Sequence, residues 1–338
     1  MSVPPLTPLA GMLDRLLASA GEGMPATVPL TDAVGLVAAE TVRAPHPIPA
    51  RPQALRRGIA IASSAVVGAT PYAPALLSEA PRAVAPGDIL PDGCDAVLPA
   101  DAVQSAGPLH EVGQAAYPGE DVVVAGGDLG AGAVIVAAGA AVTPAAVLGL
   151  SLAGRSSLAV RQPAIALRLP APGAKALAAW MATSLTQAGC RIVVDEPASL
   201  VVALALSDRP GGLALNPGRD VALDLSGPVP ILEVPARIDQ VAAAVFGLLM
   251  PLVASLTGRR LRVVKRPLTR KLVSQVGLSD VVLLRTVEAG YEPLSVGRIT
   301  LAALLVADAV AIIDPSSEGA AAGDPLSAVP LIEPFEPL

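Results

Sequence analysis

The sequence has few aromatic residues and few of the residues that bind transition metals. Phenylalanine, tyrosine and tryptophan make up 2% of the 338 residues, so the hydrophobic cores must be built from alanine, valine and leucine. Cys94 and Cys190 are the two cysteines, and His46 and His110 are the two histidines. These numbers exclude a disulfide framework and a zinc or other His/Cys cluster. No metal ligands are therefore predicted.

The sequence also lacks an excess of basic residues. Its 23 lysines and arginines face 29 aspartates and glutamates, which gives a net charge of −6. Because binding to phosphates requires a basic surface, nucleic acid is not an expected partner. The first ten residues contain no basic stretch followed by an apolar run. No secretory signal is expected, and the cytoplasm is the expected compartment.

Two long uncharged stretches, residues 131–154 and 241–258, raise the question of a membrane. The first is interrupted by glycines and by Thr143-Pro144, and the second by Gly247 and Pro251. A spanning helix needs about 20 predominantly apolar residues. We therefore expect buried helices and no membrane-spanning segment.

The apolar content is sufficient for more than one core, with 53% hydrophobic and 15% charged residues in a chain longer than one compact domain. Residues 9–17 have apolar side chains at helical spacing, and Gly21 ends that helix. A second helix is expected to start at Thr31, whose hydroxyl can cap it. Residues 41–52 contain four prolines and are expected to form an extended connector.

The pattern then changes twice. Residues 58–132 alternate short apolar runs, such as 58–67, with Pro/Gly turns, which is typical of a small β-rich unit. Thr143-Pro144 predicts a helix over 145–153. Beyond residue 158 strands alternate with helices, which favours a mostly parallel sheet. The expected strands are 164–169, 190–194, 200–206, 221–225 and 229–234, the helices are 174–188 and 238–256, and the clearest later strands are 281–287 and 309–313.

Five short stretches follow one another along nearly the whole chain. They include Leu90-Pro-Asp-Gly-Cys94, Pro118-Gly-Glu-Asp-Val122 and Val193-Val-Asp-Glu-Pro197. The complete set covers residues 29–45, 90–99, 118–144, 193–197 and 277–324. In this order they resemble the MoeA family, the bacterial counterpart of the gephyrin C-terminal region. Each motif alone is common, and the specificity comes from their combination.

The resemblance implies an α/β fold with β-rich subdomains and a four-part, MoeA-like architecture. Residues 1–57 and 133–160 would form an N-terminal and linker region, and residues 58–132 an inserted β-rich subdomain. Residues 161–259 would form a shortened, MogA-like three-layer α/β domain of the molybdopterin-binding type. Residues 260–338 would form a C-terminal β-barrel-like domain. The resemblance also implies a dimer.

The family's reaction inserts molybdate into the dithiolene of molybdopterin, which is presented as its adenylate. Such a reaction requires carboxylates near Mg²⁺ or the oxyanion, glycine-rich backbone for phosphate, and a hydroxyl group. The resemblance therefore implies molybdopterin and Mg²⁺ as ligands. It implies as partner a molybdopterin-type anionic small molecule or another molybdenum-cofactor protein.

Several positions depart from the family pattern. Arg57 replaces the carboxylate before Gly58, and Pro86 replaces a threonine. The turn at residues 168–173 has lost its acids and hydroxyls, and the turn at residues 235–238 has lost its glycine. A serine- and glycine-rich loop is missing near residues 207–219. The scaffold is kept, but most groups that the reaction needs are absent.

Candidate site residues remain. By resemblance, Asp128 and Asp195 are the catalytic candidates, and Arg57, Gly127, Pro217, Gly218 and Arg219 are the substrate-binding candidates. For Asp128, a turn residue that caps local amides is the favoured interpretation. For Asp195, it is an acid that opens a helix with Glu196 and Pro197.

The basic residues and the tryptophan have alternatives of their own. Arg56-Arg57 is either a solvated pair at a hinge or an anion site. The run from Arg259 to Lys271 has seven basic residues in thirteen. A solvated strand and linker is favoured there over binding of an anionic cofactor or acidic partner. Trp180 is expected to be a core residue and not a platform for a ligand.

Three functions are compatible with these observations. The first is a protein of molybdenum cofactor biosynthesis that binds molybdopterin or a partner but is impaired in molybdate insertion. The second is an active molybdopterin molybdotransferase. The third is a non-catalytic subunit with a structural or dimerisation role.

Overall fold

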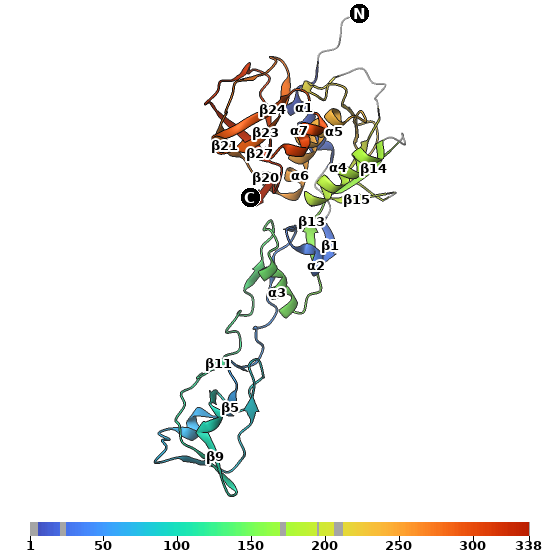
Figure 1. The fold of residues 1–338 in the computed structure, drawn as a ribbon. Coiled ribbons are helices and arrows are strands. Elements are labelled where there is room, and N and C mark those ends of the chain that lie inside the picture. Colours follow the sequence, from blue (N-terminus) through green and yellow to red (C-terminus); the bar gives the residue numbers. More distant parts are fainter. Residues whose placement is uncertain (1–5, 21–24, 170–173, 195, 206–211, 338) are drawn as a thin grey trace, which may run out of the picture. The chain divides into compact units, whose positions relative to one another are not determined.

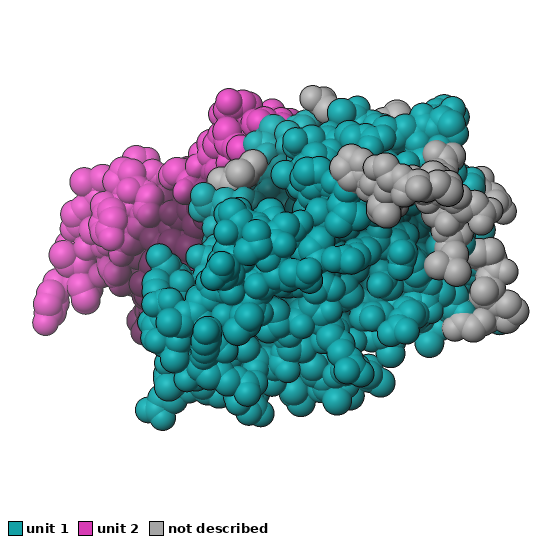
Figure 2. Space-filling view, turned by 90° about the horizontal axis from the view of Figure 1, so that it is seen from above, with its two compact units in different colours: residues 1–40, 138–143, 157–338 teal, residues 41–137, 144–156 magenta. Residues whose placement is uncertain are grey.

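The protein is described by a computed structural model that covers residues 6–20, 25–169, 174–194, 196–205 and 212–337. The chain divides into two compact units (Figures 1 and 2). Unit 1 contains Met1–Glu40, Ala138–Thr143 and Ser157–Leu338, and unit 2 contains Thr41–Ala137 and Pro144–Ser156. The four-part division and its boundaries stay a prediction.

A five-stranded sheet forms the α/β part of unit 1. Its strand order is β15-β14-β16-β19-β18. The first four strands are parallel, and β18 runs antiparallel to β19. The mostly parallel sheet predicted from the sequence is therefore confirmed. The strands are β14 (Ala164–Arg168), β15 (Arg191–Val193), β16 (Leu200–Ala203), β18 (Ala222–Asp224) and β19 (Ile231–Glu233).

Helices with apolar faces pack on this sheet. In α1 (Leu9–Ala20), Met12, Leu16 and Ala20 recur every fourth residue and are buried, as the helical spacing predicts. The other helices are α4 (Lys175–Gln187) and a continuous run of α5 (Ile238–Ala244), a π-helical segment (Val245–Leu249) and α6 (Met250–Thr257). We call this run the long helix.

The long helix lies in the core of unit 1. Its length and composition would suffice to cross a membrane, but 78% of its most apolar window is buried inside the protein. Pro251 falls in its interior, just after the π-helical segment. A proline has no N–H to donate, and a local widening of the helix accommodates it. The apolar stretch is therefore a buried core helix, as expected.

A second, six-stranded sheet belongs to the same unit. Its path is β17-β23-β25-β27-β21, with β24 paired to β23. Side chains alternate along β23, so Val281 and Leu283 join the core of the α/β part, while Val282 and Leu284 join a separate smaller core. Its strands are β17 (Leu215–Asn216), β21 (Val264–Pro267), β23 (Ser279–Val287), β24 (Gly290–Val296), β25 (Ala309–Ile313) and β27 (Pro325–Pro330).

Shorter elements complete unit 1. β20 (Arg259–Leu261) pairs with β28 (Phe335–Pro337), and α7 (Leu301–Val306) is capped by the Thr300 hydroxyl. β13 (Ser157–Arg161) lies between β1 (Pro25–Pro29) and β2 (Val37–Ala38).

The helix expected from Thr31 is only one turn, α2 (Leu30–Ala33), and Thr31 does not cap it. β1 keeps the chain extended through Pro29, where it pairs with Ser157. Gly35 then takes a positive φ of 82°. Only one turn of helix fits between these two constraints. The expected start and cap at Thr31 were wrong.

Unit 2 consists mainly of short strands, as predicted. Gly58 begins β5 (Gly58–Ile61), and Leu98 ends β8 (Ala96–Leu98). These strands can approach closely because Gly58 has no Cβ, which would overlap with the carbonyl oxygen of Leu98. Within the apolar run 58–67, β5 ends at Ile61. The chain then turns because Asp95 accepts hydrogen bonds from the Ser63 amide and hydroxyl, at 2.7 and 2.8 Å.

The strands of unit 2 form two three-stranded sheets and two two-stranded pairs. One sheet is β7-β5-β8, another is β6-β10-β9, and two-stranded pairs join β11 to β4 and β12 to β3. The helix α3 (Pro144–Leu152) starts at the predicted proline. The strands are β3 (Val42–Arg43), β4 (Gln53–Ala54), β5 (Gly58–Ile61), β6 (Ala75–Leu77), β7 (Ala83–Val84), β8 (Ala96–Leu98), β9 (Val103–Ala106), β10 (Leu109–Val112), β11 (Val122–Val123) and β12 (Val134–Val136).

Candidate functional site

The carboxyl ends of the parallel strands form one edge of the five-stranded sheet. Strands β14, β16 and β19 end there in register. Since α4 follows β14 and the long helix follows β19, both helices begin at this edge. Open α/β sheets bind their ligands at the carboxyl ends of the strands. We call this region the carboxyl edge.

Strand β18 brings the Pro217–Arg219 segment to the carboxyl edge. It is antiparallel to β19, and its first residue, Ala222, is opposite Glu233, the last residue of β19. Arg219, three residues before the start of β18, therefore lies beside the carboxyl end of β19. The sequence motif identified these residues, but their location depends on the direction of β18.

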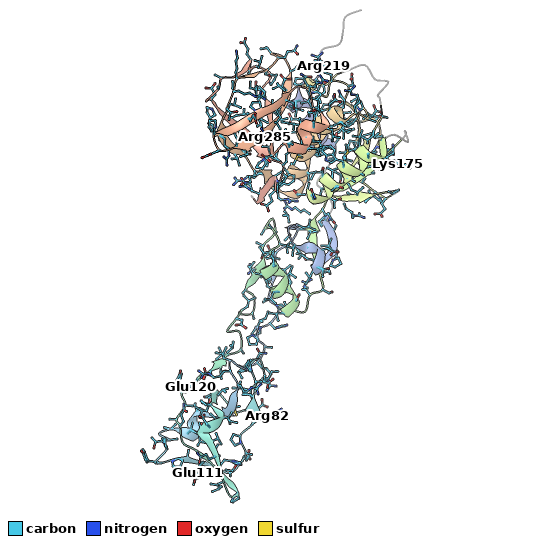
Figure 3. The ribbon with its side chains drawn as sticks, in the orientation of Figure 1. Arg82, Glu111, Glu120, Lys175, Arg219 and Arg285 are labelled. Atoms are coloured by element: carbon cyan, nitrogen blue, oxygen red, sulfur yellow. The ribbon has the colours of Figure 1, made fainter. Side chains whose placement is uncertain are left out.

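Backbone geometry fixes this segment. The Asn216-Pro217 peptide bond is cis, and Gly218 has a φ of +135°. A Cβ on Gly218 would lie 2.9 Å from Leu215 Cδ2, so only glycine fits. The Arg219 carbonyl accepts a hydrogen bond from the Leu213 amide at 2.9 Å. The Arg219 side chain is left exposed at the surface of unit 1 (Figure 3).

The buried carboxylate of Asp280 holds Asn216, the residue that precedes this segment. Asp280, at the start of β23, is 2% exposed. Its Oδ1 accepts from Asn216 Nδ2 at 2.6 Å. Its Oδ2 accepts from the Ser274 hydroxyl at 2.7 Å and the Gln275 amide at 2.9 Å. Gly297 packs against this pair, since a Cβ there would overlap with Asn216 Nδ2.

Sequence reasoning missed Asp280. The available signal was an acid directly before the apolar run 281–284, because an acid next to such a run is rarely buried without partners.

Basic side chains surround the carboxyl edge. Arg168 ends β14, Lys175 begins α4, and both are exposed. Arg237 precedes the long helix and donates two hydrogen bonds to Asp239, each 3.1 Å. These bonds and the charge of Asp239 raise the pKa of Arg237. Because Arg237 is paired with Asp239, the groups of this edge that suit an anion are Arg168, Lys175, Arg219 and the positive end of the long helix.

Two acceptor atoms at the same edge have no donor. Glu233 Oε2 and Gln240 Oε1 are buried, and neither has a hydrogen-bond partner in the part of the chain that the structure describes. Buried acceptors are normally satisfied.

The acidic candidate of the α/β part lies outside the described residues. Asp195 is not described, nor are residues 170–173 of the first turn or 206–211 of the shortened loop. The prediction that Asp195-Glu196-Pro197 opens a helix was wrong. Residues 196–199 are not helical, and β16 begins at Leu200. Glu196 is exposed and pairs with Arg191 at 2.6 Å.

The other candidates belong to unit 2. Arg56 pairs with Asp121 at 2.7 Å, whereas Arg57 is exposed and has no ion pair among the described residues. Gly127 is required by its surroundings, because a Cβ there would lie 2.9 Å from Val123 Cγ1.

Asp128 is also in unit 2 and is exposed. Its amide donates to the Ile48 carbonyl at 3.1 Å. Within the described ranges its carboxylate has no hydrogen bond, so the structure gives no support to the expected capping of local amides.

The chemistry available to these residues is limited. Among the residues with described positions, no three His, Cys, Asp or Glu side chains converge to hold a metal ion. Mg²⁺ is usually bound by a few carboxylates together with substrate phosphates, and the described residues form no cage of three or more such side chains for it. Cys94 is a poor nucleophile, because burial and then the charge of Asp95 raise the pKa of its thiol.

The first half of the chain matches a known protein family. Residues 7–154 match the MoeA N-terminal region, domains I and II. Over 146 residues the chain is 32% identical to molybdopterin molybdenumtransferase 2 of Mycobacterium tuberculosis, in strains CDC 1551 and H37Rv alike. The match covers 38% of this chain and only 36% of the length of these curated relatives.

Solved structures share the fold over almost the whole chain. A molybdopterin biosynthesis MoeA protein from Pyrococcus horikoshii superposes with a TM-score of 0.72 and 18% identity, covering 96% of this chain and 99% of the other. A second structure of a MoeA protein from that organism gives 0.64 and 20% over the same shares. A molybdenum cofactor biosynthesis protein from Pyrococcus furiosus gives 0.58 and 15%, covering 96% and 98%. At these identities the likeness concerns the fold.

Proposed function

We propose that this chain is a divergent member of the MoeA family, because its first half matches the family's N-terminal region and its fold is that of MoeA proteins, and that it acts in molybdenum cofactor biosynthesis. Its role would be to bind a molybdopterin-type anion while being impaired in molybdate insertion. The observation that carries the proposal is the exposed Arg219 at the carboxyl edge. The segment that contains Arg219 follows Asn216, which is hydrogen-bonded to the buried Asp280.

Binding is supported by the charge and shape of the carboxyl edge. Molybdopterin carries a phosphate, and exposed arginines can bind phosphate oxygens through two parallel N–H groups. The long helix begins at this edge, and helix N-termini favour anions.

Impaired insertion is supported by the scarcity of acids. A divalent cation is held by carboxylates, and the described residues bring no three acidic or other metal-binding side chains together. In unit 2 the reversal of charge at Arg57 acts in the same direction. This chain can therefore hold the organic anion but has little to hold Mg²⁺.

The remaining features of the role are also proposals. The partner would be either the molybdopterin-type anion itself or another protein of the molybdenum cofactor pathway. The protein would act in the cytoplasm and as a dimer, as the resemblance to the family implies.

Isothermal titration with molybdopterin tests the binding proposal. We expect saturable binding, and we expect Arg219→Gln to weaken it by about tenfold, the value of one charge-assisted hydrogen bond. The matched control is Arg285→Gln. Arg285 is an exposed arginine on β23 that is paired with Glu292 on β24 (Figure 3). This substitution should leave the affinity unchanged.

Two results would contradict the proposal. If the unmodified protein did not bind molybdopterin, a structural role would remain. If the Arg219 and Arg285 variants lost affinity equally, the carboxyl edge would not be the binding site.

A further inference from the structure

Three aromatic side chains of this aromatic-poor chain line one cavity of unit 1. Phe246 and Phe335 are the two phenylalanines and Trp180 is the one tryptophan. All three line a cavity of about 730 Å³. Trp180 and Phe246 meet edge to face, with their ring centroids 6.2 Å apart and their planes at 80°. Half of the aromatic residues of this chain, the two phenylalanines and the tryptophan, therefore lie at one place, while the three tyrosines lie elsewhere.

This aromatic cavity is separate from the carboxyl edge. It is lined by the middle and the end of α4, including Trp180 and Ser184, and by Arg259, which follows the end of the long helix. Both helices begin at the carboxyl edge, so their later residues lie away from it. The cavity is not used by the proposed function, and the inference that follows is independent of that function.

Arg259 is the cation of the cavity, and several contacts hold its guanidinium. Nη2 donates to the Ala188 carbonyl at 2.6 Å, and Nε donates to the Thr257 hydroxyl at 3.3 Å. Its Cζ lies 5.0 Å from the centre of the Phe335 ring, a cation–π contact. Gly189 makes room for it, because a Cβ there would overlap with Nη2.

The positive charge of Arg259 has no carboxylate partner among the residues that the structure describes. Glu333 is the other charged residue of the lining, and it is exposed and makes no ion pair with Arg259. A guanidinium has five N–H groups, and the two bonds to Ala188 and Thr257 occupy two of them. Donors therefore remain for an anion.

The partly buried position of Arg259 strengthens its interaction with such an anion. Burial lowers the pKa of Arg259, which shows that its charge is partly removed from water. The neighbouring Cys190 does not compensate the charge, because burial raises the pKa of its thiol to about 12 and keeps it neutral. A partly desolvated charge is stabilised by a directly bonded opposite charge.

We propose that this cavity binds a small aromatic monocarboxylate, with its rings among Trp180, Phe246 and Phe335 and its carboxylate on Arg259. The cavity volume of about 730 Å³ falls within the range of small-molecule sites, about 300–1,000 Å³. Aromatic walls with one well-placed charge are the usual composition of such sites. Offset and edge-to-face contacts favour an aromatic ring over an aliphatic chain.

The test compares two probes of nearly equal shape, biphenyl-4-carboxylate and biphenyl-4-carboxamide, on the full chain. Titration calorimetry measures their affinities, and the fluorescence of the single tryptophan, Trp180, reports whether they reach the cavity. We expect the carboxylate to bind about ten times more tightly than the carboxamide. Both probes should change the fluorescence.

Variants assign the preference to Arg259. Arg259→Gln should abolish the tenfold preference, while Arg259→Lys should keep part of it. Arg262→Gln, an exposed neighbour outside the lining, should keep all of it. If thermal unfolding shows that Arg259→Gln is unfolded, Phe335→Leu replaces it and should weaken both probes alike.

The proposal would be overturned by equal affinities of the two probes for the unmodified protein. Unchanged Trp180 fluorescence at saturating carboxylate would also overturn it, as would a preference that survives Arg259→Gln.

Discussion

Removing the Asp280 carboxylate should destabilise unit 1 and loosen the Arg219 segment. Asp280→Ala leaves three donors without an acceptor: Asn216 Nδ2, the Ser274 hydroxyl and the Gln275 amide. Each buried donor that loses its partner costs about 1–3 kcal/mol. We expect a total loss of about 3–5 kcal/mol, because some donors will find water as the site relaxes.

Urea unfolding followed by Trp180 fluorescence is the suitable assay, because the single tryptophan lies in unit 1. Asp280→Asn keeps one acceptor oxygen and should lose less, about 2 kcal/mol. The control is Asp308→Ala, which removes one exposed hydrogen bond from the Thr286 amide and should cost about 1 kcal/mol.

The reasoning would be refuted if Asp280→Ala cost less than about 1 kcal/mol or no more than the Asp308 control. A further consequence concerns binding. At a temperature where Asp280→Asn is still folded, its affinity for molybdopterin should fall, because Asn216 precedes the Pro217–Arg219 segment.

Two further predictions concern stability. Burial raises the pKa of the Cys190 thiol from 9.0 to about 12. Above pH 9 this thiol therefore loses its proton in the unfolded chain but keeps it in the folded protein, so the free energy of unfolding falls as pH rises. Between about pH 8 and pH 10 the free energy of unfolding in urea should fall by about 1.3 kcal/mol more for the unmodified protein than for Cys190→Ala. An equal dependence on pH in the two proteins would contradict this. Gly58→Ala should destabilise unit 2 by about 2 kcal/mol, because its Cβ would overlap with the Leu98 carbonyl. Gly130→Ala, where the space is open, should change the thermal midpoint little, and equal effects of the two would be inconsistent with the packing described.

Local patterns predicted the elements that depend on local sequence. The spacing of Met12 and Leu16 predicted α1, and the uninterrupted apolar run at residues 309–313 predicted β25 with its observed bounds. Predictions failed where distant pairing decides the outcome. α2 is short because β1 is held by Ser157, which is more than a hundred residues away in the sequence.

The candidate site was predictable only in part. The Pro217-Gly218-Arg219 motif could be recognised, but its place at the carboxyl edge follows from the antiparallel pairing of β18. Asp280 was missed because its partner Asn216 is 64 residues away.

The basic run from Arg259 to Lys271 was expected to be a solvated strand and linker, and most of its charged residues are exposed. Arg259 is the exception, because it bonds a carbonyl 71 residues away. Trp180 was expected to be a core residue. It packs against the core but is only half-buried and also lines the aromatic cavity.

The central claim, that the MoeA scaffold keeps a site for the anion but not the chemistry of insertion, is tested most directly by a metal-insertion assay. Purified protein is incubated with molybdate, Mg²⁺ and adenylated molybdopterin, and the molybdenum cofactor formed is measured. The account predicts that the protein binds molybdopterin and forms no cofactor above the background without protein. Turnover by the unmodified protein that Asp128→Asn abolishes would contradict it and would establish an active molybdotransferase.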